Sequence, residues 1–446
     1  TACYGKWNIG ETNGESRPIA HGFDHWIGID HNTGYFDHSN NTGTEVLFEN
    51  GRQITHRKGE YLTDIFAGAA IDFLRGHVEN HSDRPFFLYL PWAVPHNPLQ
   101  TPEDEGFDAD DGPEPGTPEG RAAYVRMVEY LDERIGDILA VLEEEGLAQN
   151  TLILFTSDNG GQRSANNWPL KSGKTWLEEG GIRVPCLLRW PGVIPAGSVC
   201  DQPSILMDAT VTILEATGAL AQVPQGRTLD GVDLVAYITG RRPPEVRRFG
   251  WRRRHWNHVS NYLRQEALRF GDWKLLRRYQ YLGNREFSAA YHEELYNLAT
   301  DPGEQHDLAA EEPVRLAEMR TRFEDWKRDV LPEDPSFYPP VQDQTGSPPK
   351  DKLEAYLENA PNPEGGRYVP NPDPDARALV LFEFDGARRQ GALMSRNNRE
   401  RIEEQGPADS VWRVRVQPDI VFPSPILYRE GRIDTARFTH LHIRWR

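Results

Sequence analysis

Short apolar runs alternate with amphipathic segments of helical spacing through the first half of the chain, and this alternation limits the folds open to it. The helical segments cover residues 62–80, 118–145 and 202–218. The apolar runs are FFLYL (86–90), TLILFT (151–156) and VPCLLRWPG (184–192). Continuous apolar runs of this length are typical of strands buried on both faces of a sheet. The pattern predicts an α/β fold with a mainly parallel sheet flanked by helices.

The pattern changes after residue 243, so an α/β domain is expected over 1–243. Residues 244–330 combine arginines and aromatic residues with short strand-like runs and a helix at 311–330, which predicts a small antiparallel α+β subdomain. Residues 331–375 are rich in proline, as an extended linker would be. Residues 376–446 predict a partial β-sandwich-like domain. Its FTHLHIRWR resembles strands of carbohydrate-associated modules, and a plain structural appendage is the alternative.

The charge and cysteine content exclude several classes of protein. The formal net charge is −18, and a nucleic-acid-binding protein needs a basic face, so no nucleic-acid partner is expected. No apolar run approaches the ~20 residues of a membrane span. The cysteines have neither metal-ligand spacing nor the pattern of a disulfide framework; they are Cys3, Cys186 and Cys200.

The sequence SDNGG directly follows the apolar run TLILFT. Ligands of open α/β sheets bind at the carboxyl ends of the strands, so Asp158 and Asn159 lie where a site is expected. Their side-chain oxygens suit a hard cation such as Ca²⁺ or Mg²⁺. The alternative is an Asp-Asn-Gly turn that merely ends the strand.

Three further segments offer groups for binding an anion. Lys174 lies in a glycine-containing loop soon after SDNGG, where its ammonium could bind an anion, or it is an ordinary surface lysine. His96 follows the FFLYL run between two prolines, and it could act as acid, base or anion ligand or be a structural histidine. Lys6 and Asn8 lie in the opening turn GKWNIG, which could equally be a surface turn.

These segments together resemble the sulfatases. GKWNIGE resembles their Gly-Lys-Trp-His-Leu-Gly motif, and RPFFLYLPWAVPHNPLQTPE their strand leading to a Pro-His-x-Pro histidine. LILFTSDNGG resembles the metal-binding strand, and LKSGKTWLEEGGIRVP the loop of the second lysine. RFGDWKLL and ELYNLATDPGEQHDL resemble the C-terminal subdomain. The resemblance covers roughly residues 1–330 and implies an alkaline-phosphatase-like fold and hydrolysis of sulfate esters.

The resemblance also implies a role for each motif residue. Lys6 and His96 would contact the sulfate, and His96 would assist proton transfer. Lys174 would neutralise the leaving ester oxygen. Asp158 and Asn159 would bind Ca²⁺. A divalent cation and two lysines suit a reaction that builds charge on the leaving oxygen while the other sulfate oxygens stay anionic.

The sequence departs from the sulfatase pattern in two respects. Asn8 stands where the family usually has a histidine, and an amide cannot exchange a proton near neutral pH. The Cys/Ser-x-Pro/Ala-x-Arg motif that yields the formylglycine nucleophile is missing, and so is the Asp-Asp pair that completes the metal site; CDQPS at 200–204 has the wrong spacing. A segment carrying both is therefore expected before Thr1. Residues 1–446 alone are expected to be inactive.

Two alternatives to a sulfatase stay open. A hydrolase of phosphate or phosphonate esters from the same superfamily typically has Asp-His-Gly where this chain has Asp158-Asn159-Gly160. A non-catalytic binding protein would be consistent with Asn8 and the missing nucleophile, and the upstream coding sequence would decide between these alternatives.

The substrate and the compartment are expectations from the sulfatase reading. The β tail favours a sulfated saccharide. Arg163, Asn167 and Trp168 lie in the loop between the metal ligands and Lys174, and are candidates for holding the sugar. A periplasmic or extracellular location is expected from the family resemblance.

Overall fold

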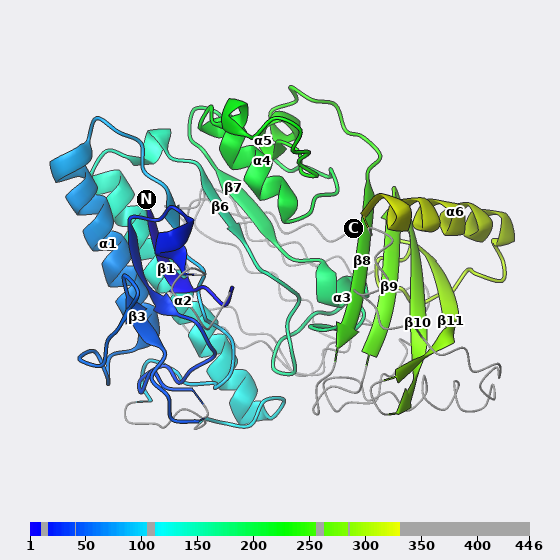
Figure 1. Cartoon of the computed structure of the whole chain (residues 1–446), viewed down its shortest axis with the longest axis horizontal. Coiled ribbons are helices and arrows are strands. Elements are labelled where there is room, and N and C mark those ends of the chain that lie inside the picture. Colours follow the sequence, from blue (N-terminus) through cyan, green and yellow to red (C-terminus); the bar gives the residue numbers. More distant parts are fainter. Residues whose placement is uncertain (10–16, 41, 105–111, 256–262, 284–285, 331–446) are drawn as a thin grey trace, which may run out of the picture. The chain divides into compact units, whose positions relative to one another are not determined.

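The computed structural model describes residues 1–9, 17–40, 42–104, 112–255, 263–283 and 286–330 (Figure 1). The described chain divides into two compact units. Within the described residues, the first holds Thr1–Thr151 and Trp190–Gly192, and the second holds Leu152–Arg189 and residues 193–330. The linker expected at 331–375 and the β domain expected at 376–446 lie outside the described residues, and the expected boundary at 243 stays a prediction.

A five-stranded mixed sheet forms the centre of the first unit, in the order β4-β3-β2-β1-β5. The first strand, β1, runs parallel to both of its neighbours, β2 and β5, while β3 and β4 run antiparallel at the far side. The strands are β1 (Ala2–Lys6), β2 (His25–Ile29), β3 (Leu47–Glu49), β4 (Arg52–Gln53) and β5 (Leu88–Tyr89). The carboxyl ends of β1, β2 and β5 therefore lie at one edge of the sheet.

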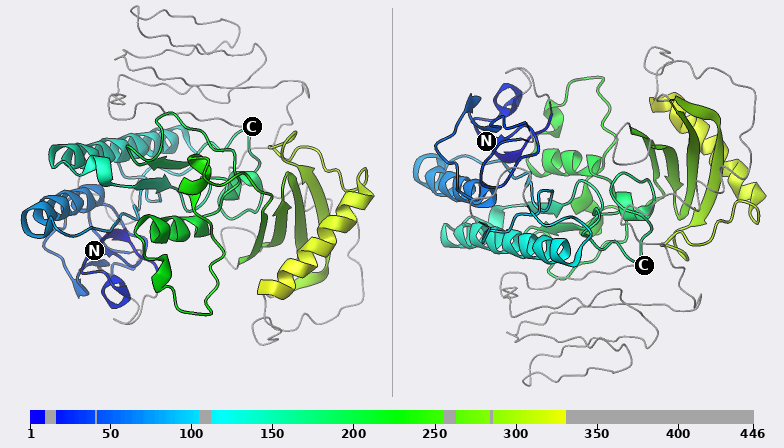
Figure 2. Two further views of the ribbon diagram at one scale, coloured as in Figure 1. Left: turned by 90° about the horizontal axis from the view of Figure 1, so that it is seen from above. Right: turned by 90° about the horizontal axis from the view of Figure 1, so that it is seen from below.

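Two long helices accompany this sheet, α1 (Leu62–His81) and α2 (Pro118–Glu144), and they lie side by side (Figure 2). Both were expected from the periodicity. The hydroxyl of Thr117 accepts a hydrogen bond from the Gly120 amide, which caps the start of α2. Gly146 follows its end with a φ of 69°, a conformation that glycine adopts without steric cost. Short 3₁₀ turns cover Pro18–His21 and Ala148–Asn150.

The two apolar runs before the candidate site are less buried than predicted. Burial on both faces was expected, yet Phe87 and Tyr89 at β5 are 37% and 45% exposed, and Phe155 of β6 (Ile153–Thr156) is 38% exposed. That expectation is wrong for the described structure. The reason is their place in the described sheets. There β5 is the last strand at one edge, and β6 pairs only with β7 (Cys186–Arg189).

The second unit begins with the antiparallel pair β6 and β7, followed by short helices. The helix expected over 202–218 begins only at Met207, because the Asp208 carboxylate accepts the Ile205 amide and holds the preceding turn outside the helix. The helices are α3 (Glu179–Ile182), α4 (Met207–Ala216) and α5 (Leu234–Ile238), with a 3₁₀ turn at Leu220–Gln222.

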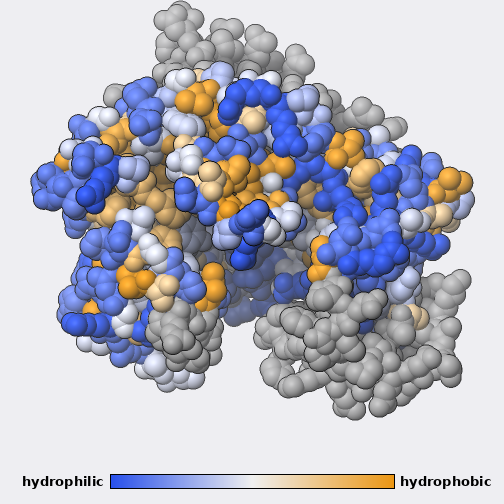
Figure 3. Space-filling view, turned by 45° about the horizontal axis from the view of Figure 1, so that its top comes forward, coloured by the Kyte–Doolittle hydropathy of each residue, from blue (hydrophilic) through white to orange (hydrophobic). Residues whose placement is uncertain are grey.

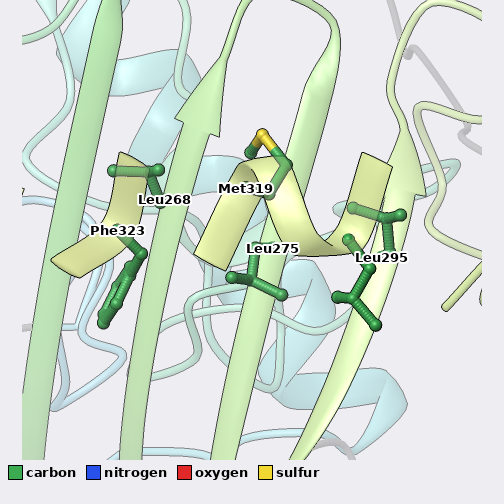
Figure 4. Packing of buried hydrophobic residues seen from close by; sticks show 6 residues of the cluster. Leu268, Leu275, Leu295, Met319 and Phe323 are labelled. Carbon is green, nitrogen blue, oxygen red and sulfur yellow. The ribbon is translucent and has the colours of Figure 1, made fainter. Parts of the chain in front are cut away.

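A four-stranded antiparallel sheet and a closing helix complete the second unit, as the expected α+β subdomain requires. The helix α6 (Pro313–Val330) crosses one face of the sheet (Figure 2). Its Met319 and Phe323 pack onto Leu268, Leu275 and Leu295, which point at the helix from three neighbouring strands (Figure 4). The strands are β8 (Arg248–His255), β9 (Leu263–Phe270), β10 (Trp273–Gly283) and β11 (Glu286–Asn297).

The opposite face of this sheet meets the segment that carries Lys174. Leu177 and Ile182 pack there against Ala267 and Leu276. The apolar contact is small because most neighbouring side chains on this face are charged, as described below. The visible surface is largely hydrophilic with hydrophobic residues between (Figure 3).

Candidate active site

The first unit gathers polar residues at the carboxyl ends of its three parallel strands. Lys6 is the last residue of β1, and its backbone amide donates to the Pro91 carbonyl, 2.7 Å away, just after β5. A Cβ added at Gly5 would lie 2.2 Å from that same carbonyl oxygen, so only glycine permits this approach. The opening Gly-Lys turn therefore contacts the segment that leads from β5 to His96.

Lys6 has a partner that the sequence analysis missed. Its Nζ donates to Oδ1 of Asn32 at 2.6 Å. Beside it, Nδ1 of His31 lies 3.0 Å from Oδ1 of Asp30. These three polar residues follow β2 as Lys6 follows β1, so the strand-end argument used for SDNGG would have found them.

Asn8 occupies a left-handed turn at the surface, with a φ of 49°. Asparagine and histidine adopt this conformation more readily than most residues. The turn is held by Trp7, whose ring lies 5.9 Å from that of His21 and 6.1 Å from that of Phe23. The Asn8 side chain makes no hydrogen bond with any residue that the structure describes.

His96 is oriented by contacts on both sides. Its Nδ1 lies 2.8 Å from the Asn97 carbonyl oxygen, and its own carbonyl accepts the Tyr35 hydroxyl at 3.0 Å. A carbonyl oxygen only accepts, so Nδ1 carries the proton in this contact. Nε2 is then the basic nitrogen of the neutral ring.

In the second unit, Asp158 and Asn159 follow β6 as predicted. Asp158 is exposed, and its carboxylate has no hydrogen bond or ion pair within the described ranges. The side-chain NH₂ of Asn159 donates to the Gly160 carbonyl at 2.9 Å, which leaves its amide oxygen as an acceptor. The Asp158 carboxylate and the Asn159 amide oxygen are hard ligands with no competing partner among the described residues. Oxygens of this kind are the ligands that calcium prefers.

The strand end and the Lys174 segment are locked together through glycines. The Gly160 amide donates to the Gly181 carbonyl at 2.9 Å, and the Lys174 amide to the Gly161 carbonyl at 3.0 Å. A Cβ on Gly160 would lie 1.7 Å from the Gly180 carbonyl oxygen. Backbone approaches this close explain why both SDNGG and EEGG carry paired glycines.

Lys174 itself is half-buried, and its ammonium has no partner in the described part of the chain. Ser172 and Thr175 beside it have φ values of 63° and 84°. Such angles are strained for any residue with a Cβ and most of all for a β-branched threonine, and strained backbone clusters at functional sites. The structure therefore brings Lys174 to the Asp158 strand end on a constrained loop.

The three sugar-contact candidates differ in their surroundings. The side-chain amide of Asn167 is hydrogen-bonded to the protein backbone. Its Nδ2 donates to the Gly161 and Ser172 carbonyls at 2.9 and 3.1 Å, and its Oδ1 accepts the Gly161 amide at 3.0 Å. Trp168 is 48% exposed. Arg163 is half-buried, with a φ of 26°. Their contact with a sugar stays a prediction.

A buried ionic cluster, which the sequence did not predict, joins the Lys174 segment to the four-stranded sheet. Arg278 donates to Glu178 at 2.7 Å and to Glu294 at 3.0 Å, and Lys274 pairs with Glu179 at 2.9 Å and Glu304 at 2.8 Å. Glu178 and Glu179 are the acidic pair of the EEGG motif.

Within this cluster, the pKa values of Glu294 and Glu304 are shifted in opposite directions. Burial acts to raise the pKa of Glu294, but attraction to Arg278 and its hydrogen bonds outweigh burial and lower the pKa to about 2. For Glu304, burial and repulsion from Glu179 and Glu178 outweigh the attraction of Lys274 and raise the pKa to about 7.

Among the described residues, no three His, Cys, Asp or Glu side chains form a metal-binding group, and no helix is long and apolar enough to cross a membrane. Burial raises the pKa of the Cys3 thiol to about 12, so it is not a nucleophile near neutral pH. Burial likewise raises the pKa of Cys186.

Comparisons with known proteins agree with the resemblance seen in the motifs. The sulfatase family model matches residues 1–219, and the model described as N-sulphoglucosamine sulphohydrolase, C-terminal, matches residues 172–328. The chain belongs to the sulfatase family. The predicted family and the alkaline-phosphatase-like fold class are both confirmed.

Individual relatives show how far the similarity reaches. The chain is 33% identical over 252 residues to N-acetylgalactosamine-6-sulfatase of Canis lupus familiaris, covering 53% of this chain and 45% of that protein. It is 36% identical over 200 residues to the steryl-sulfatase of Rattus norvegicus, covering 42% and 31%. The chain thus spans less than half the length of these curated relatives.

One solved structure resembles the fold more extensively. It is Ps i-CgsB in complex with k-i-k-neocarrahexaose, which is 26% identical and has a TM-score of 0.61. The similarity covers 80% of this chain and 75% of that one. It spans both of the compact units described above.

Proposed function

We propose that the protein hydrolyses sulfate esters of a saccharide in a calcium-dependent reaction. The observation that carries the proposal is the hydrogen bond from the Lys174 amide to Gly161. It ties an ammonium that has no partner among the described residues to the strand end bearing Asp158 and Asn159. A cation site and a lysine joined in this way suit an anionic substrate, and the chain belongs to a family named for sulfate-ester chemistry.

In this proposal each residue has one task. Asp158 and Asn159 would hold calcium through their oxygens, and the bound ion would polarise a sulfate oxygen. Lys174 would offset charge on the leaving oxygen, and Lys6 would contact the sulfate. His96, with its Nδ1 proton directed at Asn97, would exchange a proton through Nε2.

The nucleophile and the role of Asn8 are separate parts of the proposal. The family resemblance implies a formylglycine, and burial raises the thiol pKa values of Cys3 and Cys186, which makes both poor nucleophiles. Asn8 would offer a hydrogen bond in place of the usual histidine, leaving proton removal to water or another group.

A saccharide is favoured as the substrate over a sterol or a simple aryl group. The support is the galactosamine-sulfatase relative, the oligosaccharide-bound neighbour and the half-exposed indole of Trp168, which could stack on a sugar ring. The similarity to a steryl-sulfatase makes a small apolar sulfate ester the second candidate substrate. We also propose that the protein acts in the periplasm or outside the cell, as the resemblance implies.

The test is sulfate release by the protein expressed from its whole coding sequence, with calcium present. Sulfated galactosaminides and carrageenan oligosaccharides are compared with a steroid sulfate and with a phosphate ester. Lys174→Ala should abolish release, whereas Lys58→Ala, which removes an exposed lysine paired with Glu45, should not. Equal turnover of the phosphate ester, or no turnover of any sulfate ester, would overturn the assignment.

A further inference from the structure

Glu304 is an unusual residue in the turn that precedes α6. It is fully buried, and it adopts a φ of 54°, which is strained for a residue with a long side chain. The turn is fixed by Asp301, whose carboxylate accepts the amides of Gln305 and His306 at 2.7 and 2.9 Å. A strained backbone and a buried carboxyl both cost free energy, so the contacts of Glu304 must offset that cost.

Glu304 touches the Lys174 segment at two points. Its Oε2 accepts the backbone amide of Glu179 at 2.7 Å, and its backbone carbonyl accepts Nζ of Lys171 at 3.2 Å. Lys171 and Glu179 bracket Lys174, and the Gly180 amide closes the loop by donating to the Lys171 carbonyl at 2.8 Å. One distant residue therefore ties both ends of the loop.

The other carboxylate oxygen of Glu304 is held by the sheet. Nζ of Lys274, which is fully buried in β10, lies 2.8 Å from Glu304 and 2.9 Å from Glu179. Burying such charges costs solvation that an apolar replacement would not, so their presence is weak evidence for stability alone. Their geometry does fix the position of the backbone at Glu179.

We propose that Glu304 is a positioning residue for Lys174, fixing the 171–181 loop between the four-stranded sheet and the Asp158 strand end; the inference rests on the proposed sulfatase function. The chain of contacts is continuous. Glu304 holds the Glu179 amide, the Gly181 carbonyl two residues later accepts the Gly160 amide, and the Gly161 carbonyl accepts the Lys174 amide. Loss of the Glu304 carboxylate would release one end of that chain.

The protonation of Glu304 should influence the loop. The charged or titratable groups that face the cluster around it come from several elements: Glu178, Glu179, Lys171, Lys274, Arg278, Glu294 and Tyr296. Burial and the neighbouring carboxylates raise its pKa to about 7, so the packed state favours the protonated form. The packed loop should therefore lose stability as the pH rises from about 4.5 to about 7, and the loss should be complete above pH 7.

The first experiment measures hydrogen exchange in residues 171–181 of the full protein. Glu304→Ala should speed exchange there about 10-fold or more, while Glu304→Gln, which keeps the shape and an acceptor, should stay near wild type. Corrected for intrinsic rates, wild-type exchange should increase between about pH 5 and pH 7 and then level off, and Glu304→Gln should lack that increase. The control is Glu311→Ala, an exposed residue just beyond the turn.

The second experiment measures turnover of a sulfated saccharide by the same variants. Glu304→Ala should lower kcat by about 10–100-fold with little change in KM, as is typical when a supporting contact of a reacting group is lost. Glu304→Gln should restore most of the rate. A variant that unfolds at a lower temperature but keeps wild-type exchange at 171–181 and wild-type kcat would overturn the proposal.

The two experiments separate the two proposals. If the wild-type protein releases no sulfate, the proposed function fails, and the exchange data still decide whether Glu304 fixes the loop. If Glu304→Ala does not fold, the comparison of wild type with Glu304→Gln across about pH 5–8 decides instead. Identical pH dependence in those two proteins would contradict the role of Glu304.

Discussion

The backbone amide of Lys174 donates to the carbonyl oxygen of Gly161, 3.0 Å away, three residues beyond Asp158. This bond joins the loop of Lys174 to the strand end of Asp158, and neither side chain has a charged partner in the described structure. Neither side chain makes a hydrogen bond or ion pair with a described residue, so substitutions at these two positions should affect ligand binding and leave the fold intact.

Asp158→Ala should abolish or strongly weaken calcium binding without lowering the unfolding temperature in calcium-free buffer. The carboxylate makes no hydrogen bond or ion pair with a described residue, so its removal leaves no buried group unpaired. Titration calorimetry with calcium measures the first effect and thermal unfolding the second. Asp83→Ala, at an exposed site, is the control. Unchanged calcium affinity in Asp158→Ala would remove this residue from the metal site.

Gly160→Ala should destabilise the protein by about 1–3 kcal/mol or more and abolish turnover, because the added methyl would lie 1.7 Å from the Gly180 carbonyl oxygen and push the two loops apart. Gly68→Ala is the matched control. It lies inside α1 with open space around it, and helix propensity predicts a gain of roughly 0.5–1 kcal/mol there. Chemical denaturation measures both, and a stable, active Gly160→Ala would contradict the close packing.

Three substitutions of Asn8 separate its backbone role from its polar role. Asn8→Gly keeps the left-handed turn and removes the amide, whereas Asn8→Ala also strains the turn at a φ of 49°. If the amide matters in catalysis, both should lower kcat by about 10–100-fold. Asn8→His should be tolerated, since histidine accepts this backbone conformation. Full activity of Asn8→Gly would show that the residue only forms the turn.

Asn167 and Trp168 should respond in opposite ways. Asn167→Ala breaks three hydrogen bonds to the Gly161 and Ser172 backbone and should cost about 1–3 kcal/mol of stability. Trp168→Ala removes a half-exposed ring and should cost less stability than Asn167→Ala while raising KM for a saccharide but not for a small aryl sulfate. Equal effects of Trp168→Ala on both substrates would argue against sugar stacking.

Acid should unfold the second unit partly through Glu294. Its pKa is lowered from 4.5 to about 2 in the folded protein, since Arg278 outweighs the effect of burial. A lowered folded pKa contributes stability that is present above about 4.5 and lost as the pH falls toward 2, roughly 3 kcal/mol in all. Glu294→Gln should therefore be less stable than wild type at pH 7, and the difference should shrink below pH 4. A pH-independent difference in unfolding free energy would contradict this.

The helices and the site-bearing strand ends were predictable because their signals are local. The apolar spacing of 62–80 and 118–145 gave α1 and α2, and the polar residues that follow TLILFT gave the Asp158 strand end. The same local rule would also have pointed to Asn32, the partner of Lys6. Burial of β5 and β6 was predicted wrongly because composition reports apolarity, whereas exposure depends on which strands pair on each side.

The sequence by itself determined the family, the order of the elements and the residues offered for chemistry, since each depends on neighbours within one motif. Only the tertiary structure decided how the Lys174 loop is held. The Glu179 amide meets Glu304 across 125 residues, and Lys274 meets Glu179 across 95. Surface charges in a sequence look the same as buried ones, because pairing and burial arise only when distant segments pack. The physical reason is that an isolated carboxylate prefers water, and only the assembled sheet and loop supply the partners that make its burial tolerable.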